Sequence, residues 1–291
     1  MAVVAARVAV YVTLAAAFGI PLQALMDGWR IRRWWLMASV GAALISSVAA
    51  LLVLTASMAG TAILPVDGEM LRMVLAETPV GVAFSVRFAA LFVAMFGSWR
   101  GGRGGTIIVC ASSAVALATV AWTGHGAMQD GPAGRVHLTA DIVHALAGTA
   151  WIGAIVTLSL RLFVAHRDVT ALRDAVAALH RFALAGSVLA ATVVVTGVIN
   201  GWMIVGTDAL AVLRSTLYGQ LLTAKLALFA MMLTLAARHR WILIPRLRDA
   251  VNLGERGDGS RSLLYSLELE LLCGLSILVI VAWLGTLSPT G

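Results

Sequence analysis

Long apolar runs separated by short polar connections make up the chain. Eight of these runs are long enough to cross a bilayer core, which takes about 20 helical residues. They lie at 2–25, 34–57, 80–98, 105–123, 138–162, 181–205, 218–238 and 264–287. Lipid offers the backbone no hydrogen-bond partners, so we expect every run to be an α-helix. The pattern lacks the short alternating strands of a barrel and predicts an all-α, polytopic membrane protein surrounded by lipid.

The short connections between the runs determine the expected domain organisation. The longest connections span only about two dozen residues, which leaves no room for a soluble domain, so residues 1–291 are predicted to form one membrane domain. No charged segment precedes the first run, and we expect it to be a retained helix and not a cleaved signal peptide. Gly19 and Pro21 favour a kink or an early end of that helix.

Composition supports the membrane assignment. Hydrophobic residues make up 60% of the chain and charged residues 12%, whereas soluble domains carry about 25% charged residues. Cys110 and Cys273 lie inside different runs and form no paired motif, so we interpret them as buried thiols.

The basic residues are distributed unevenly between the two sides. Fifteen of the 21 fall in the connections after the first, third, fifth and seventh runs: Arg30, Arg32, Arg33, Arg100, Arg103, Arg161, Arg167, Arg173, Arg181, Arg238, Arg240, Arg246, Arg248, Arg256 and Arg261. Arginine and lysine collect on the cytoplasmic side of membrane proteins. Both termini are therefore predicted to lie outside, and the excess of arginine reflects topology and not nucleic-acid binding.

One stretch, GHGAMQDGPAGRVHLTADIVHALAGTAWIG at 124–153, differs from the other connections and runs. Gly and Pro residues in 124–136 predict a short irregular loop on the outer side. His125 then ends one helix and His137 opens the next. His137, Asp141 and His144 are spaced i, i+4 and i+7, so they share one helical stripe, which continues to Gly148 and Trp151.

The stripe carries ionisable groups into the membrane. His137 and His144 are separated by about 10 Å along the helix, with Asp141 one turn from each. Asp141 can bind a metal together with either imidazole, or orient one of them. A buried ionisable group in a membrane indicates a functional site, so we interpret His125, His137, Asp141 and His144 as a metal or proton site. The alternative is a set of histidines satisfied by neighbouring carbonyls in a helix interface.

Two buried cations and several methionines extend this hypothesis. Arg87 and Lys225 lie within runs at a depth similar to that of Asp141, and either could neutralise it; Lys225 could instead reach the interface. Met203 lies near the outer end of its run, on the side where Met58, Met70, Met73 and Met128 are also expected. Thioether and imidazole suit monovalent copper, and imidazole with carboxylate suits divalent copper or zinc.

The second half of the chain resembles the copper-resistance D family. The resemblance rests on GH at 124–125, HLTADIVHALAGTAWIGAIVTL at 137–158, TGVINGWMIVG at 196–206 and YGQLLTAKLALFAMMLTLAARHRWILIPRL at 218–247. It implies an inner-membrane protein that handles copper and moves it towards the cytoplasm. The positions matching its motifs are His125, Asp141, His144, Trp151, Asn200, Trp202 and Lys225. We expect a periplasmic copper-binding donor, if one is used, to be a separate protein.

The sequence leaves other functions open. The chain could carry electrons through haem b between two facing histidines, or serve as a copper receptor that does not transport. His166, His180 and His239, each next to an arginine, are predicted to be solvated cytoplasmic histidines and not ligands. No nucleophile–base pair is visible, so we do not expect an enzyme, and no phosphate-binding motif indicates ATP-driven pumping.

Overall fold

The computed structural model describes residues 1–123, 131–165, 169–205, 216–252 and 258–288. Within these ranges the chain is helical and contains no strand. The helices are α1 (Ala2–Asp27), α2 (Arg33–Ala59), α3 (Gly68–Glu77), α4 (Pro79–Arg100), α5 (Gly102–Ala118), η1 (Ala121–Thr123), α6 (Gly131–Ala165), α7 (Val169–Val205), α9 (Leu217–Arg238), η4 (His239–Leu243), α10 (Ile244–Asn252) and α11 (Asp258–Leu284).

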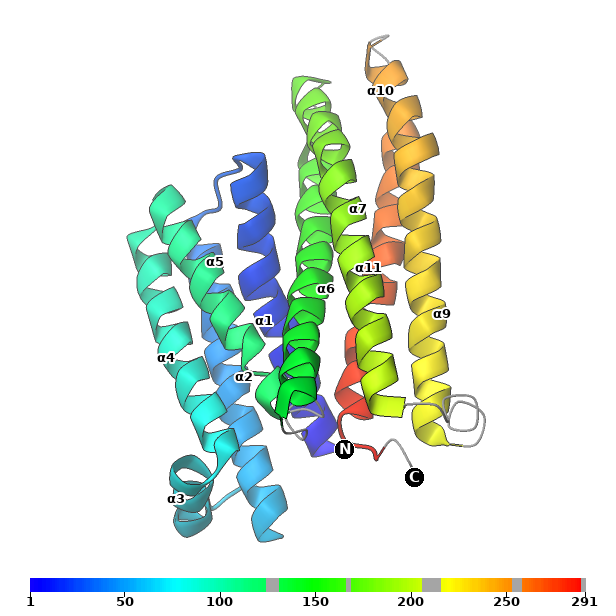
Figure 1. The fold of residues 1–291 in the computed structure, drawn as a ribbon. Coiled ribbons are helices and arrows are strands. Elements are labelled where there is room, and N and C mark those ends of the chain that lie inside the picture. The colour runs from blue at the N-terminus through cyan, green and yellow to red at the C-terminus, as the bar shows by residue number, and fades with distance from the viewer. Residues whose placement is uncertain (124–130, 166–168, 206–215, 253–257, 289–291) are drawn as a thin grey trace.

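The long helices run side by side and alternate in direction (Figure 1). Among the described residues, seven helical stretches are long and apolar enough to cross a membrane. The predicted run 105–123 forms α5, an apolar helix of 17 residues, followed by the turn η1. Both termini lie at the same end of the bundle as the short helix α3. The prediction of an all-α protein with many membrane-length helices is therefore confirmed.

Two hydrophobic cores divide the bundle into halves. One core is built mainly by α1, α2, α4 and α5, and the other by α6, α7, α9, α10 and α11. Helices α1 and α6 join the halves where Gly19 and Gly153 meet: a Cβ on Gly19 would lie 2.9 Å from the Cα of Gly153. The missing side chains let the two backbones touch. Pro21 lies inside an unbroken α1, so the expected early end of the first helix is wrong.

Three helices extend well beyond the predicted runs. Helix α6 begins at Gly131 instead of 138, α7 begins at Val169 instead of 181, and α9 continues through η4 and α10 to Asn252. Hydropathy ends a run at the first charges, but Arg, Ala and Leu all favour the helix, so the backbones of α7 and α9 continue past the apolar segment. The added turn of α6 contains Gly131, Pro132 and Gly134, and its proline is at the helix start, where proline is tolerated. The extensions of α7 and α9 rise together above the bundle, whereas that of α6 lies at the opposite end, with the chain termini (Figure 1).

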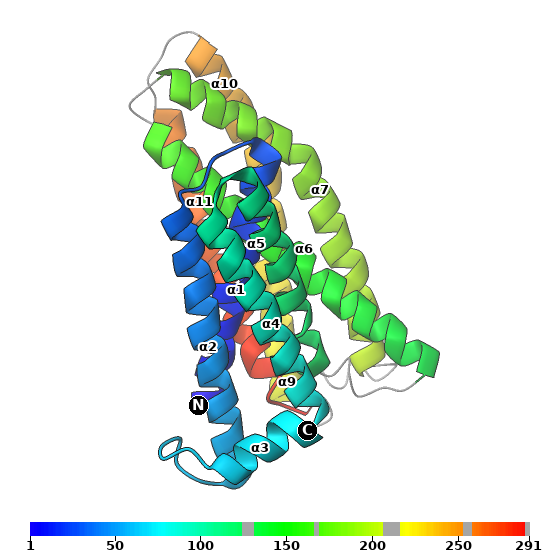
Figure 2. The same ribbon diagram turned by 90° about the vertical axis from the view of Figure 1, so that its left-hand side faces the viewer.

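The connection between the second and third runs also contains an unpredicted helix, α3. The Asp67 side chain accepts a hydrogen bond from the Met70 amide and begins this helix, a common N-terminal cap. Thr78 caps α4 in the same way through Gly81, and Pro79 follows at the first position of α4. Helix α3 lies across the end of the bundle where the termini are (Figure 2).

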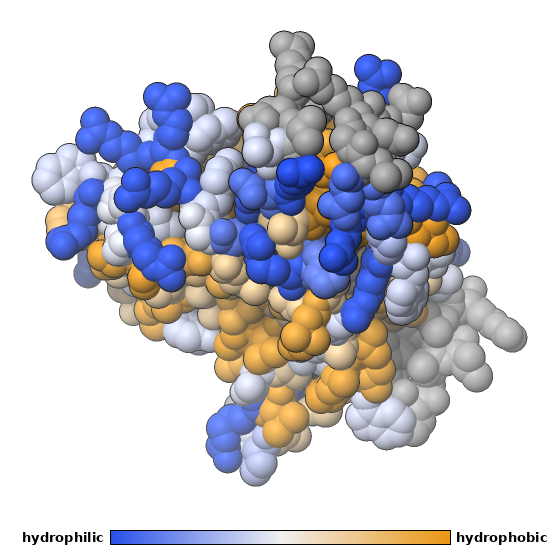
Figure 3. Space-filling view, turned by 90° about the horizontal axis from the view of Figure 1, so that it is seen from above, coloured by the Kyte–Doolittle hydropathy of each residue, from blue (hydrophilic) through white to orange (hydrophobic). Residues whose placement is uncertain are grey.

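Arginine side chains gather at the opposite end. Figure 3 looks down on this end, and hydrophilic side chains cover much of it. Exposed arginines there include Arg33, Arg100, Arg103, Arg246 and Arg248, each at or near a helix end. Arg161 instead pairs with Asp27 at 3.1 Å and links α6 to α1. The uneven distribution of charge along the sequence thus becomes a difference between the two ends of the bundle.

Candidate metal site between helices α6, α7 and α9

His144 is held between α6 and α7. Its Nδ1 lies 3.0 Å from the hydroxyl oxygen of Thr196 on α7. The Thr196 hydroxyl in turn donates to the carbonyl oxygen of Thr192 at 2.6 Å. Because the only hydroxyl proton is used there, Thr196 accepts from His144, and the proton of the neutral imidazole is on Nδ1. The lone pair of Nε2 is then available to a cation, as in histidines whose other nitrogen is fixed by a neighbour.

Asp141, one turn before His144, faces groups from two further helices. Asn200 on α7 donates from Nδ2 to its Oδ1 at 3.4 Å. Lys225 and Tyr218 on α9 both interact with Asp141 electrostatically, and Lys225 also acts on His144. Residues 218 and 225 are seven apart, so they share a face of α9. The carboxylate thus accepts a hydrogen bond from the Asn200 amide and interacts electrostatically with Lys225 and Tyr218.

Asn200 has an unused acceptor. Its Oδ1 is buried and has no hydrogen-bond partner among the residues that the structure describes. A buried carbonyl oxygen without a partner is unfavourable by about 1–3 kcal/mol. Its neighbour is the Asp141 carboxylate, so a cation bound there would satisfy the amide oxygen and the carboxylate together.

Gly197 makes the close approach of His144 to α7 possible. A Cβ at this position would lie 3.3 Å from Cε1 of the imidazole, which is tighter than ordinary contact. Thr196, Gly197 and Asn200 therefore give a physical reason for the TGVIN segment at 196–200: it holds the imidazole and the carboxylate of α6. Gly201, one turn on, has open space where its side chain would be.

The remaining predicted ligands have different positions. His137 is 2% exposed and lies in the second turn of α6, not at the start of the helix, because α6 begins at Gly131 with Pro132 in its first turn. Met203 lies near the end of α7, three residues after Asn200 and so on a nearby face. His125 lies outside the described residues. Within the described part, no three His, Cys, Asp or Glu side chains are close enough to hold one metal ion.

The structure separates three of the supporting residues from this cluster. Trp151 is buried on α6 and donates to Glu270 of α11 at 2.8 Å. Trp202 is 67% exposed on α7 and faces outward. Arg87 is buried on α4, where its Nε donates to the Thr119 hydroxyl at 2.9 Å and its guanidinium lies 4.7 Å from the centre of the Phe84 ring. Of the two cations predicted to neutralise Asp141, Lys225 is the one on the neighbouring helix.

The prediction for His239 is wrong. Its side chain is 6% exposed and not solvated, and it contacts Glu270 and Ser266 on α11. The flanking Arg238 and Arg240 suggested a solvated helix end, because the partners lie about 30 residues further along the chain. His180 is exposed, as predicted, and His166 lies outside the described residues.

Sequence reasoning also missed several groups of the candidate site. Thr196 and Tyr218 were not singled out, although both lie within quoted motifs, because a hydroxyl in an apolar run usually bonds to its own helix. Thr196 contacts His144 only because α7 packs against α6. In the same way, Tyr218 of α9 interacts with Asp141 only in the folded bundle.

Comparison with known proteins covers both halves of the chain. Residues 1–135 match the family model for the copper resistance protein D-like N-terminal domain, and residues 176–284 match that for copper resistance protein D. Copper resistance protein D of Pseudomonas syringae pv. tomato is 36% identical over 98% of this chain and 96% of its own length. Inner membrane protein YebZ of Escherichia coli (strain K12) is 27% identical over 58% of this chain and 55% of its own length. No solved structure matches.

These matches agree with the architecture. Membrane-length helices occur in both halves of the chain, and one family model matches 1–135 and the other 176–284, with 136–175 between them. Together with the relatives, the seven apolar helices support a multi-pass protein of the inner membrane with a role in copper handling. The chain belongs to the copper resistance protein D family.

Proposed function

We propose that this protein carries copper across the inner membrane from the periplasm to the cytoplasm. In this proposal α5 is the eighth crossing, both termini are periplasmic, and the arginine-rich end is cytoplasmic, in keeping with the positive-inside rule. A length of 17 residues spans about 26 Å, a little less than the hydrocarbon core. A modest local thinning of the bilayer accommodates that difference.

The polar cluster of α6, α7 and α9 is the proposed copper site. His144 and Asp141 lie in the first half of α6, and Asn200 lies near the end of α7, so the cluster is nearer to the end that carries the termini. Copper arriving from the periplasm therefore meets it early. His125, His137 and Met203 are the proposed outer ligands that would receive the ion before His144 and Asp141 do.

The observation that carries this proposal is the arrangement of His144. Thr196 accepts a hydrogen bond from Nδ1 and so orients Nε2. Asp141 lies one turn before His144 on α6, and Asn200 lies one turn after Thr196 on α7, with an oxygen that has no hydrogen-bond partner in the part of the chain that the structure describes. Imidazole, carboxylate and amide oxygen are cation ligands. Lys225 offsets the Asp141 charge while no ion is present, and an entering copper ion takes over that role. Such competition keeps the binding weak enough for release.

Uptake by the purified protein tests the proposal. Liposomes containing the protein and an internal copper-sensitive dye should accumulate copper faster than protein-free liposomes. His180→Gln, at an exposed position near the start of α7, should transport like wild type and serves as the control. Copper binding without uptake would favour the receptor function instead. A haem absorption band with no copper bound would favour the electron carrier.

A further inference from the structure

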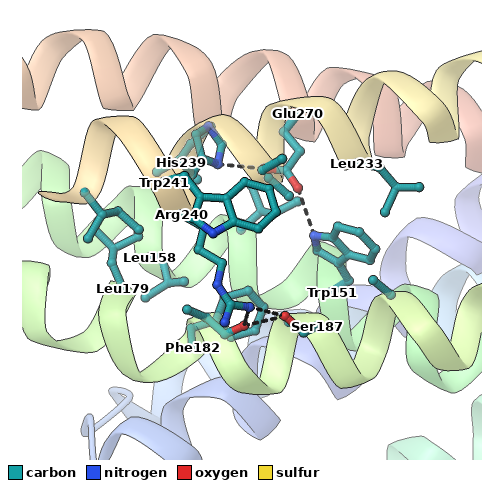
Figure 4. A pocket seen from close by; sticks show the side chains of 18 residues that line it. Trp151, Leu158, Leu179, Phe182, Ser187, Leu233, His239, Arg240, Trp241 and Glu270 are labelled. Atoms are coloured by element: carbon teal, nitrogen blue, oxygen red, sulfur yellow. Dashed lines mark hydrogen bonds and ion pairs between the residues drawn. The ribbon is translucent and has the colours of Figure 1, made fainter.

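A second polar cluster lies nearer to the arginine-rich end and plays no part in the proposed copper site. We call it the inner cluster; its members are Trp151, His239, Ser266 and Glu270. Glu270 accepts from Trp151 Nε1 at 2.8 Å and lies 3.2 Å from His239 Nδ1. His239 Nε2 is 2.8 Å from the Ser266 hydroxyl. The chain of contacts joins α6, η4 and α11 (Figure 4).

The inner cluster is buried but borders open space. Glu270 is 2% exposed and His239 6%, yet both line a cavity of about 230 Å³ between α6, α7, η4 and α11. This volume is enough for several water molecules, and water enters cavities where polar partners are present. Arg240 crosses the cavity and donates to the Ala183 carbonyl oxygen and the Ser187 hydroxyl of α7. The lining is mostly apolar, and the polar groups that face the cavity are those of Ser187, His239, Arg240 and Glu270.

The backbone at this point departs from regular α-helix. Residues His239–Leu243 form a π-helical turn between α9 and α10. Pro245 explains it: proline has no amide proton and collides with the carbonyl one turn before it, so the hydrogen-bond pattern shifts. Short π turns inside long helices are frequent at functional sites. Here the turn begins at the histidine that faces Glu270.

Few other charges act on the pair. From α11, Glu270 faces His239, and Cys273 interacts with Glu270. From α6 the neighbour is Trp151, which does not titrate. The cavity-lining residues of α7 and α9 are apolar or small, and the guanidinium of Arg240 is turned to α7. The protonation of Glu270 and His239 therefore sets the charge at this point of the membrane.

We propose that the His239–Glu270 pair is a proton-binding site that couples proton movement to copper transport; the coupling rests on the function proposed above. A proton from cavity water binds the Glu270 carboxylate and forms its O–H bond, and it returns to water when it leaves. Ionised, the carboxylate makes a strong, charge-assisted bond with the Trp151 N–H. Protonated, it makes a weaker one. Proton binding therefore loosens the attachment of α6 to α11.

Helix α6 carries this change to the copper site. His144 and Trp151 are seven residues apart, about 10 Å along the helix. On α9 and its continuation η4, Lys225 and His239 are about 21 Å apart along the helix axis. A shift of α6 that opens the copper site must stretch the Trp151–Glu270 bond, so the state of the proton and the state of the copper site depend on each other.

Copper uptake under an imposed pH difference tests the coupling. Wild-type uptake into liposomes should change several-fold with the imposed pH difference, because a proton on Glu270 weakens its bond with Trp151. Glu270→Gln keeps an acceptor for Trp151 but binds no proton, so its copper uptake and copper affinity should both lose their dependence on pH, while the protein still binds copper. His239→Gln should behave alike. Asp27→Asn, which breaks the buried pair with Arg161, is the matched control and should keep the wild-type pH profile.

Infrared spectroscopy tests the proton site without transport. The wild-type protein should gain the C=O stretch of protonated carboxylic acids as pH falls, and the difference between wild type and Glu270→Gln should isolate the component of Glu270. If this band titrates but the protein takes up no copper into liposomes, the proton site stands and the proposed function is refuted. Uptake that is independent of pH, or a titration without the Glu270 band, would overturn the proton site and leave copper transport standing.

Discussion

At the scale of single residues, the structure explains why a histidine and an aspartate stand in an apolar helix. His144 and Asp141 are half-buried, and each has a hydrogen-bond partner on α7; Asp141 also has a favourable electrostatic interaction with Lys225. Replacing Thr196 would leave the Nδ1 proton of His144 without that acceptor. The side chains of 196–200 thus prepare the imidazole for a cation.

Asp141→Asn should weaken copper binding by about 10–100-fold if the carboxylate supports the ligand and does not bind the ion directly, since lost supporting groups typically have effects of this size. Asparagine keeps the shape and loses the charge. Titration of the detergent-purified variant with copper gives the affinity. Unaltered affinity would mean that Asp141 serves packing only, and loss of all binding would make it a direct ligand.

Gly197→Ala should weaken copper binding while the protein stays folded. The new methyl carbon would lie 3.3 Å from the imidazole and push it away from Thr196. Gly201→Ala is the matched control, because its methyl group would enter open space on the same helix. Copper affinity measured for both variants distinguishes a displaced histidine from a general effect of alanine in α7. Equal affinities would contradict the assigned position of His144.

At the scale of helices, the close contact of α1 with α6 holds the two halves together. A side chain at Gly153 would overlap the backbone of Gly19, and overpacking of this kind typically costs about 1–3 kcal/mol. Gly153→Ala should therefore lower the thermal unfolding temperature in detergent. Gly148→Ala on the same helix has open space around it and should not. Comparable temperatures for the two variants would contradict the tight contact.

The sequence predicted helices well and their ends poorly. Apolar runs define the crossing segments because lipid requires helix there, and this requirement is visible locally. The extensions of α7 and α9 into polar sequence are helical for another reason, the intrinsic preference of Ala, Leu and Arg, which hydropathy does not measure. The first turn of α6 was missed because Gly131, Pro132 and Gly134 are typical of a loop. Helix α3 was not predicted because a segment of ten residues that contains Glu69 and Arg72 is typical of a loop between apolar runs.

The candidate site was predicted in the same uneven way. His137, Asp141 and His144 could be placed on one stripe because helical spacing is a local property. Tyr218 and Thr196, and the partners of His239, depend on which helices pack together, and no local pattern contains that information. The buried His239 was therefore predicted to be solvated, and Glu270, the carboxylate that it contacts, was not predicted.

At the scale of the whole molecule, the charge difference between the two ends predicts orientation. A cysteine replacing exposed Glu69 of α3 should react with an impermeant thiol reagent in intact cells, and one replacing exposed Arg248 of α10 should not. The native Cys110 and Cys273 are buried and should contribute little background. Rapid labelling at 248 with protection at 69 would invert the topology and place the copper site on the cytoplasmic side.

The proposed copper site and transport route depend above all on His144 as a copper ligand. X-ray absorption of the purified, copper-loaded protein measures this directly, because imidazole ligands give a distinct scattering pattern. We expect wild type and His239→Gln to hold copper with imidazole coordination. We expect folded His144→Ala to lose the bound copper. Retention of an unchanged, imidazole-coordinated copper ion by His144→Ala would contradict the site and the transport route built on it.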